Sequence, residues 1–150
     1  MFGQPRQGVN MYAKMGLETG VLAASPNKLI IMLYDGAISA CRGAIVHMQQ
    51  QDIQKKSDMI AKAIMIIESG LRMSLDKKAG GEIAASLDAL YMYMSNRLTI
   101  ANIRNQPKII SEVIQLLADL KGAWEAIEKT QQVGNGAPLA YSQQSNSVSV

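Results

Sequence analysis

Residues that begin or end helices recur along this chain at intervals of one long helix. Ser25-Pro26 starts the first segment, because serine is a good N-cap and proline fits the first helical position. Asp52 is the next N-cap, Gly80-Gly81 closes a loop, and Pro107 fits the first turn of the last segment. The segments carry apolar residues at helical spacing, and no stretch alternates for long enough to form a sheet. The pattern predicts an all-helical fold.

The breaks predict four helices over residues 26–50, 52–75, 82–104 and 107–130. Helices of about 23 residues joined by short connections favour an antiparallel four-helix bundle. We therefore expect three parts, which are an N-terminal segment or helix packed on the bundle (1–25), the bundle itself (26–130) and a C-terminal tail (131–150).

The two ends of the chain differ from the bundle in composition. Glycines break any long helix in the N-terminal segment, but the stretch from Tyr12 to Leu22 is apolar enough to be docked on another surface. The C-terminal tail is rich in Gly, Ser, Asn and Gln, which predicts a disordered and dispensable segment.

Reactive side chains are scarce. The chain has one cysteine, Cys41, and one histidine, His47, which lie on one predicted helix about 240° apart around its axis. We expect Cys41 to be a core residue and His47 to lie on the surface or its rim. The helices carry no Glu-x-x-His pair of the kind that binds iron in helical bundles. We therefore expect no catalytic residues, no metal site and no cofactor.

Charge and hydropathy indicate a cytoplasmic protein. The net charge is only +3, and the basic residues are spread along the chain without aromatic partners, which argues against nucleic-acid binding. The N-terminus has no apolar signal region, and the longest apolar run, Leu29 to Tyr34, is too short to span a bilayer. We expect no direct insertion into a membrane.

Two middle helices carry more apolar residues than one core stripe requires. Their expected core faces are Ile53, Ile60, Ile64, Ile67, Leu71 and Leu75, and Ile83, Leu87, Leu90, Met94, Leu98 and Ala101. A second row of Met59, Ile66 and Met73 runs between Lys55 and Lys62, and Met92, Tyr93 and Ile100 lie off the other core face. The last helix has a single stripe of Ile109, Val113, Leu116, Leu120, Trp124 and Ile127.

The extra rows have two interpretations. They can belong to the core, because a helix in a bundle touches two neighbours. They can also form an outer groove for a partner, since methionine adapts to other chains and the sequence has ten of them. The candidate groove residues are Tyr12, Met15, Met59, Ile66, Met73, Met92, Tyr93 and Ile100.

Several blocks of sequence agree in order and spacing with one known family. They are Tyr12, Ala24-Ser25-Pro26-Asn27-Lys28-Leu29-Ile30, Met32-Leu33-Tyr34-Asp35-Gly36-Ala37, Gly80-Gly81-Glu82-Ile83-Ala84, Leu87, Leu90-Tyr91-Met92-Tyr93-Met94, Leu98, Ala101-Asn102 and Ala123-Trp124. On these blocks, which cover about residues 12–127, the chain resembles the FliS family of flagellar export chaperones. Ala23 stands where the family often has threonine, which bears only on a local cap.

The resemblance implies a function and partners. It implies an antiparallel four-helix bundle that binds the disordered C-terminal region of flagellin in the cytoplasm, prevents premature polymerisation and delivers flagellin to the flagellar type III export gate. It also implies that the N-terminal segment can cover the binding pocket in the free protein. The residues by themselves leave open a helical nucleic-acid-binding or regulatory protein, a bundle enzyme, and a structural bundle that forms homodimers or larger oligomers.

Overall fold

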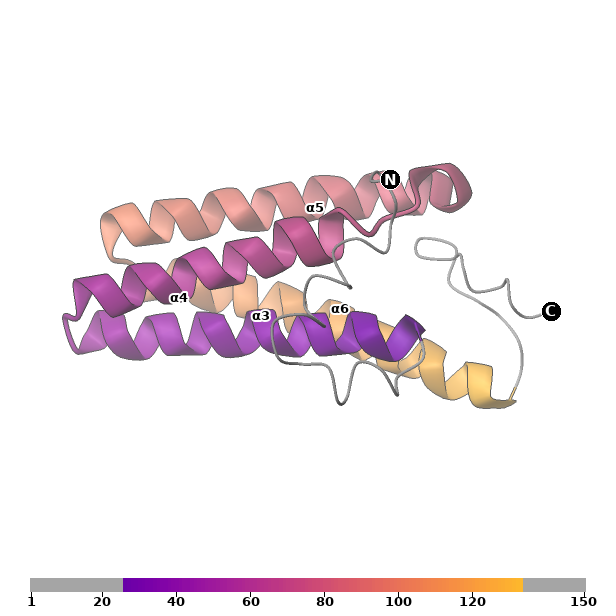
Figure 1. Cartoon of the computed structure of the whole chain (residues 1–150), viewed down its shortest axis with the longest axis horizontal. Helices are drawn as coiled ribbons and strands as arrows, with labels where there is room; N and C mark the ends of the chain where they lie inside the picture. Colours follow the sequence, from indigo (N-terminus) through magenta and orange to yellow (C-terminus); the bar gives the residue numbers. More distant parts are fainter. Residues whose placement is uncertain (1–25, 134–150) are drawn as a thin grey trace.

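The computed structural model describes residues 26–133, in which every regular element is helical. The elements are α3 (Pro26–Gln49), α4 (Ile53–Met65), η2 (Ile66–Arg72), α5 (Lys77–Arg104) and α6 (Pro107–Val133). Because η2 is a π-helix that continues α4 without a break, α4 and η2 form one arm of a four-helix bundle. Figure 1 shows neighbouring arms running in opposite directions, so the predicted antiparallel bundle is confirmed. The expected N-terminal segment with Tyr12 and Met15, and the tail beyond α6, lie outside the described residues.

Helix bounds follow local capping. The Asp52 carboxylate accepts a hydrogen bond from the Lys55 backbone N–H at 3.1 Å, which confirms the predicted N-cap of α4. Asp76 caps α5 in the same way, through the Ala79 N–H at 3.0 Å. The expected loop before Glu82 is therefore wrong, and α5 begins at Lys77. Gly81, with φ +53°, interrupts this first turn and redirects the helix.

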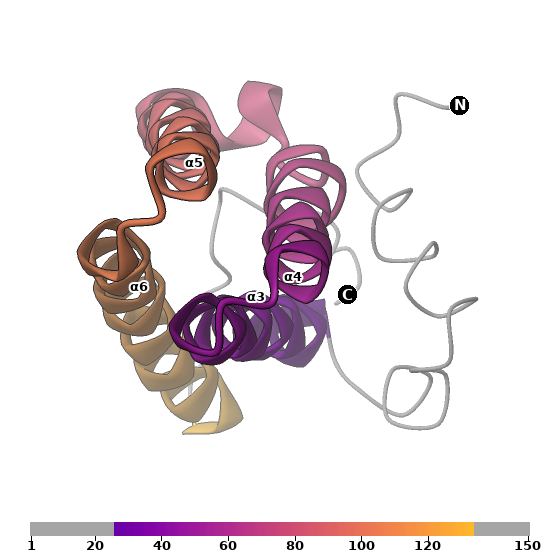
Figure 2. The same ribbon diagram turned by 90° about the vertical axis from the view of Figure 1, so that its left-hand side faces the viewer.

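The four arms form a closed ring around one core. α3 packs against α4 on one side and α6 on the other, while α5 packs against η2 and α6. Figure 2, viewed along the bundle, shows α3 and α5 on one diagonal of this ring. α6 runs to Val133, so the bundle ends slightly later than the expected boundary at residue 130.

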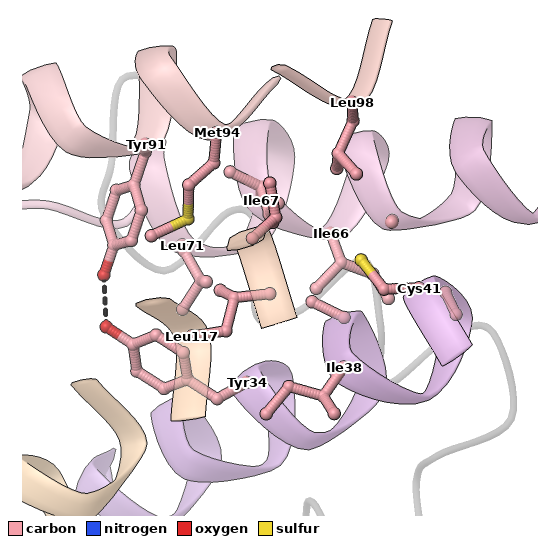
Figure 3. Close-up of a cluster of buried hydrophobic side chains, with 14 of the residues drawn as sticks. Tyr34, Ile38, Cys41, Ile66, Ile67, Leu71, Tyr91, Met94, Leu98 and Leu117 are labelled. Atoms are coloured by element: carbon pink, nitrogen blue, oxygen red, sulfur yellow. Dashed lines mark hydrogen bonds between the residues drawn. The ribbon is translucent and has the colours of Figure 1, made fainter. Parts of the chain in front are cut away.

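Most of the expected core faces are buried. The large side chains that are most completely buried are Tyr34, Ile60, Ile66, Ile67, Leu71, Tyr91, Met94, Leu98, Ile110, Val113 and Leu117. Figure 3 shows how side chains from all four arms meet there. Ile110 and Leu117 of α6 were not in the expected stripe, because α6 faces α3 on one side and α5 on the other and so buries a broader arc.

Two expected core residues are exposed, which corrects the prediction for both. Ile53 is 69% exposed and Ile83 is 58% exposed. Ile53 is the first residue of α4, so it extends beyond the packed part of the bundle. Ile83 follows the Gly81 interruption, which turns the start of α5 out of register with the core face that begins at Ala84 and Leu87.

The apolar character of α3 is accounted for by packing on two sides. By length and composition alone, α3 is long and apolar enough to cross a membrane. The longest apolar run in the sequence had indicated instead that no segment spans a bilayer. Its buried side chains include Ile30, Leu33, Ile38 and Cys41, which face α4 and α6 across the core. A helix that packs between two neighbours in a bundle needs a composition as apolar as that of a helix that could cross a membrane.

Candidate partner-binding surface

Met59 and Ile66 of the predicted row lie in the seam between α3 and the arm formed by α4 and η2, called here the α3–α4 seam, instead of lining an open groove. Ile66 is only 2% exposed, and its Cδ1 would lie 3.3 Å from a Cβ added at Gly36. Met59 is half-buried, and its Sδ would lie 3.1 Å from a Cβ at Gly43. Because the two glycines have no side chain, Ile66 and Met59 can pack closely against the backbone of α3. The expectation of an outer position for Ile66 is therefore wrong, as Figure 3 also shows.

Met73 leaves this row because η2 is a π-helix. The Met73 N–H donates to the Glu68 carbonyl at 3.0 Å, which is the i→i+5 bond of a π turn. A π turn holds more residues than an α turn, so the buried position that an α-helix would place at Met73 falls one residue later, at Ser74. Ser74 is 4% exposed there, whereas Met73 is 50% exposed. Of the three residues in the row, Met73 is thus the one that faces solvent.

The outer face of α5, defined here by Met92, Tyr93 and Ile100, is the exposed apolar surface among the predicted groove residues. Met92 and Tyr93 are each 43% exposed, and Ile100 is half-buried against the core cluster. The α5 sequence carries no charged residue between Asp88 and Arg97. The part of this face that carries Met92 and Tyr93 therefore offers apolar side chains to an apolar partner segment, and Arg97 is the charged residue between Tyr93 and Ile100.

Tyr93 is held in place at the edge of this face. Its hydroxyl donates a hydrogen bond to Glu112 Oε2 on α6, and the Arg97 Nε–H donates to Glu112 Oε1 at 2.9 Å. The Arg97 guanidinium carbon also lies 6.0 Å from the centre of the Tyr93 ring. The hydrogen bond from Tyr93 lowers the pKa of Glu112, and the same bond raises the pKa of Tyr93. An aromatic ring fixed in this way loses little side-chain entropy when a partner covers it.

An ion-pair network fixes η2 against α5 beside the outer face. Arg72 Nε donates to Asp88 Oδ1 at 2.6 Å, and its Nη1 donates to Glu68 Oε1 at 2.8 Å. Ser95 Oγ donates to Glu68 Oε2 at 2.7 Å, and Lys77 Nζ lies 3.4 Å from Asp88 Oδ2. The hydrogen bond from Arg72 lowers the pKa of Asp88. The network holds the π turn in the geometry that places Met73 outside.

The reactive residues are arranged for packing. Cys41 is fully buried, as expected, and burial raises the pKa of its thiol to about 12, so the thiolate nucleophile is scarce near neutral pH. His47 is half-buried at the end of α3. Among residues 26–133, no group of three His, Cys, Asp or Glu side chains is placed to hold a metal ion.

The comparisons with known proteins agree on one family. A family model described as flagellar protein FliS matches residues 8–131. The flagellar secretion chaperone FliS of Salmonella typhimurium is 45% identical over 120 residues, which cover 80% of this chain and 89% of the relative. The protein of the same name from Escherichia coli is 42% identical, covering 79% and 88%, and the one from Bacillus subtilis is 32% identical, covering 80% and 89%. These matches confirm the resemblance carried by the sequence blocks, and the chain belongs to the FliS family.

Proposed function

We propose that this chain is a cytoplasmic flagellar secretion chaperone that binds the disordered C-terminal region of flagellin. In this role it prevents premature polymerisation and assists delivery to the flagellar type III export apparatus. The observation that carries the proposal is the family membership, because the relatives are named flagellar secretion chaperones. The role is one of binding, without catalysis, which agrees with a buried Cys41 whose thiol has a raised pKa.

The proposed binding surface is the outer face of α5, together with Met73 and the exposed edge of Met59. Support comes from the exposure of Met92 and Tyr93 and from the anchored position of the Tyr93 ring. Tyr12 and Met15 stay in the proposal as contributions of the N-terminal segment, which acts as a lid. Ile66 leaves it, because its side chain is occupied within the α3–α4 seam.

The chemistry of the surface suits a client that must later be released. A flagellin segment that folds on this face gains apolar contact but loses conformational entropy on ordering. Its affinity is therefore modest for the area that it covers, which allows the complex to be taken apart during export.

Calorimetry with purified flagellin tests the proposal. We expect one chain to bind one flagellin whose C-terminal region is intact, and a flagellin without that region to show no binding. Met92→Ala removes apolar contact and should weaken binding by about 1–2 kcal/mol. Ala118→Ser is the control, because Ala118 is an exposed residue of α6 that is not part of the proposed face. Equal affinity for flagellin with and without its C-terminal region would refute the proposal.

Two rival functions give different results in the same set of measurements. A nucleic-acid-binding protein would bind nucleic acid with a steep dependence on salt. A structural oligomer would already be large before flagellin is added, because its outer apolar residues would be buried against other copies. Sedimentation of the free protein and of the mixture separates a homodimer from a complex of two different chains.

A further inference from the structure

The end of the bundle that carries the α3–α4 and α5–α6 turns exposes two isoleucines. Ile103 is 74% exposed and Ile53 is 69% exposed, which are the highest values among the large apolar side chains of residues 26–133. Figure 2 looks directly at this end, and Figure 1 shows it at the left. Ile103 lies in the last turn of α5 and Ile53 at the first position of α4. Neither position needs an isoleucine for the fold.

A buried lysine fixes the two isoleucine-bearing turns relative to each other. Lys56 is 4% exposed, and its ammonium donates to the Asn102 backbone carbonyl at 3.0 Å and to Asn105 Oδ1 at 2.7 Å. Ser57 Oγ donates to Asn102 Oδ1 at 3.3 Å. These bonds join the first turn of α4 to the end of α5, next in sequence to Ile103. The surface is therefore preformed, so a ligand need not order it.

The same end is positively charged. Lys56, Arg104 and Lys108 form no ion pair with any carboxylate of the described chain. The bonded partners of the Lys56 ammonium are both neutral oxygens, so its charge is uncompensated beneath the surface. Three carboxylates lie near these cations and already have partners. Asp52 caps α4 and lies 4.0 Å from Lys55 Nζ, Asp58 accepts a hydrogen bond from Gln54, and Glu112 binds Arg97 and Tyr93. The N-termini of α4 and α6 lie at this end together with the C-termini of α3 and α5, so the helix dipoles add no net charge and the positive charge comes from side chains.

We propose that this end of the bundle docks a short acidic peptide segment of another protein. Aliphatic side chains of the segment cover Ile53 and Ile103, and its carboxylates pair with the exposed Arg104 and Lys108. Charge complementarity favours this partner, since Arg104 and Lys108 are exposed and form no ion pair within residues 26–133, and an acidic segment supplies the missing anions. A membrane surface fits less well, because two isoleucines form a small apolar area and stable membrane attachment requires more than one strong signal. The proposal is independent of flagellin binding on the outer face of α5.

Titration of the full chain with a labelled synthetic peptide of alternating leucine and glutamate tests this docking surface. The comparison peptides have glutamine or lysine in place of every glutamate. We expect the glutamate peptide to bind most tightly, to lose affinity as salt is added, and to shift the NMR methyl signals of Ile53 and Ile103. Equal affinity for the glutamate and lysine peptides, or shifts confined to other residues, would overturn the proposal.

Variants locate the surface and separate it from the proposed flagellin site. The double variant Ile53→Ser/Ile103→Ser should weaken the glutamate peptide about tenfold and leave the fold intact, because both side chains are exposed. Arg104→Gln/Lys108→Gln should reduce the salt dependence, whereas Lys78→Gln/Lys129→Gln, at exposed positions elsewhere, should change nothing. Met92→Ala should leave peptide affinity unchanged. Binding of the chain to anionic vesicles that the isoleucine variant abolishes, without peptide binding, would replace the proposal with membrane attachment.

Discussion

The hydroxyl oxygen of Tyr34 on α3 lies 2.5 Å from the hydroxyl oxygen of Tyr91 on α5. Both side chains are fully buried, and the Trp124 indole N–H on α6 donates to the same Tyr34 oxygen at 3.2 Å. The pair joins the two helices that face each other across the diagonal of the bundle, as Figures 2 and 3 show. A polar link of this kind specifies which helix faces which, because a shifted arrangement would leave buried hydroxyls without these bonds.

Removal of this link should lower stability without loss of the fold. Tyr34→Phe removes both hydrogen bonds and should cost about 1–3 kcal/mol in the free energy of unfolding, measured by urea denaturation. The double variant Tyr34→Phe/Tyr91→Phe should be destabilised by less than the sum of the two single variants, since each single change already removes the same hydrogen bond. Strict additivity of the two single variants would contradict the link.

Aspartate substitutions at Ile66 and Met73 should separate the seam from the surface. Ile66→Asp buries an unpaired carboxylate and should lower the free energy of unfolding by more than about 3 kcal/mol. Met73→Asp, one heptad away but 50% exposed, should change it by less than about 0.5 kcal/mol. Circular dichroism during thermal unfolding measures both. Similar losses at the two positions would show that Met73 also belongs to the core.

Gly81 and Gly122 form a matched pair that differs in backbone conformation. A Cβ would meet no atom within 4 Å at either residue, but Gly81 has a φ of +53° and Gly122 lies within the regular helix α6. Gly81→Ala should destabilise by about 1–2 kcal/mol, because the left-handed region strains an L side chain. Gly122→Ala should stabilise by about 0.5–1 kcal/mol, because alanine favours a helix interior. Denaturant midpoints compare the two variants, and a stabilising Gly81→Ala would exclude the turn at this position.

The reactivity of the Cys41 thiol should report unfolding, and its ionisation should lower the stability of the fold at alkaline pH. Burial raises its pKa from 9.0 to about 12, so the unfolded chain loses this proton at lower pH than the folded chain. The stabilising contribution is complete below pH 9 and is lost as the pH rises through about 12. Cys41→Ala should show a shallower decline of stability in this range. At neutral pH, labelling by a thiol reagent should follow the rate of unfolding, and immediate labelling of the folded protein would contradict its burial.

Local signals in the sequence were sufficient for the helices and for much of the core. Asp52 and Pro107 act within a few residues, so the start of α4 and of α6 could be predicted without knowledge of neighbouring helices. The apolar stripe of α6 was likewise enough to identify Val113 and Trp124 as buried. Asp76 carried the same type of signal as Asp52, and it marks the true start of α5.

Whether an apolar row became core or surface depended on the residues of the neighbouring helix that faced it. Met59, Ile66 and Met73 share one spacing in the sequence, yet Gly36 and Gly43 on α3 let the first two close into a seam. The third turned outward because a π turn, fixed by bonds between Arg72, Glu68 and Asp88, shifted the register. The sequence by itself determined helices, caps and the family through short-range preferences and matching blocks. Only the tertiary structure decided which apolar residues became surface, because burial depends on contacts between helices distant in sequence.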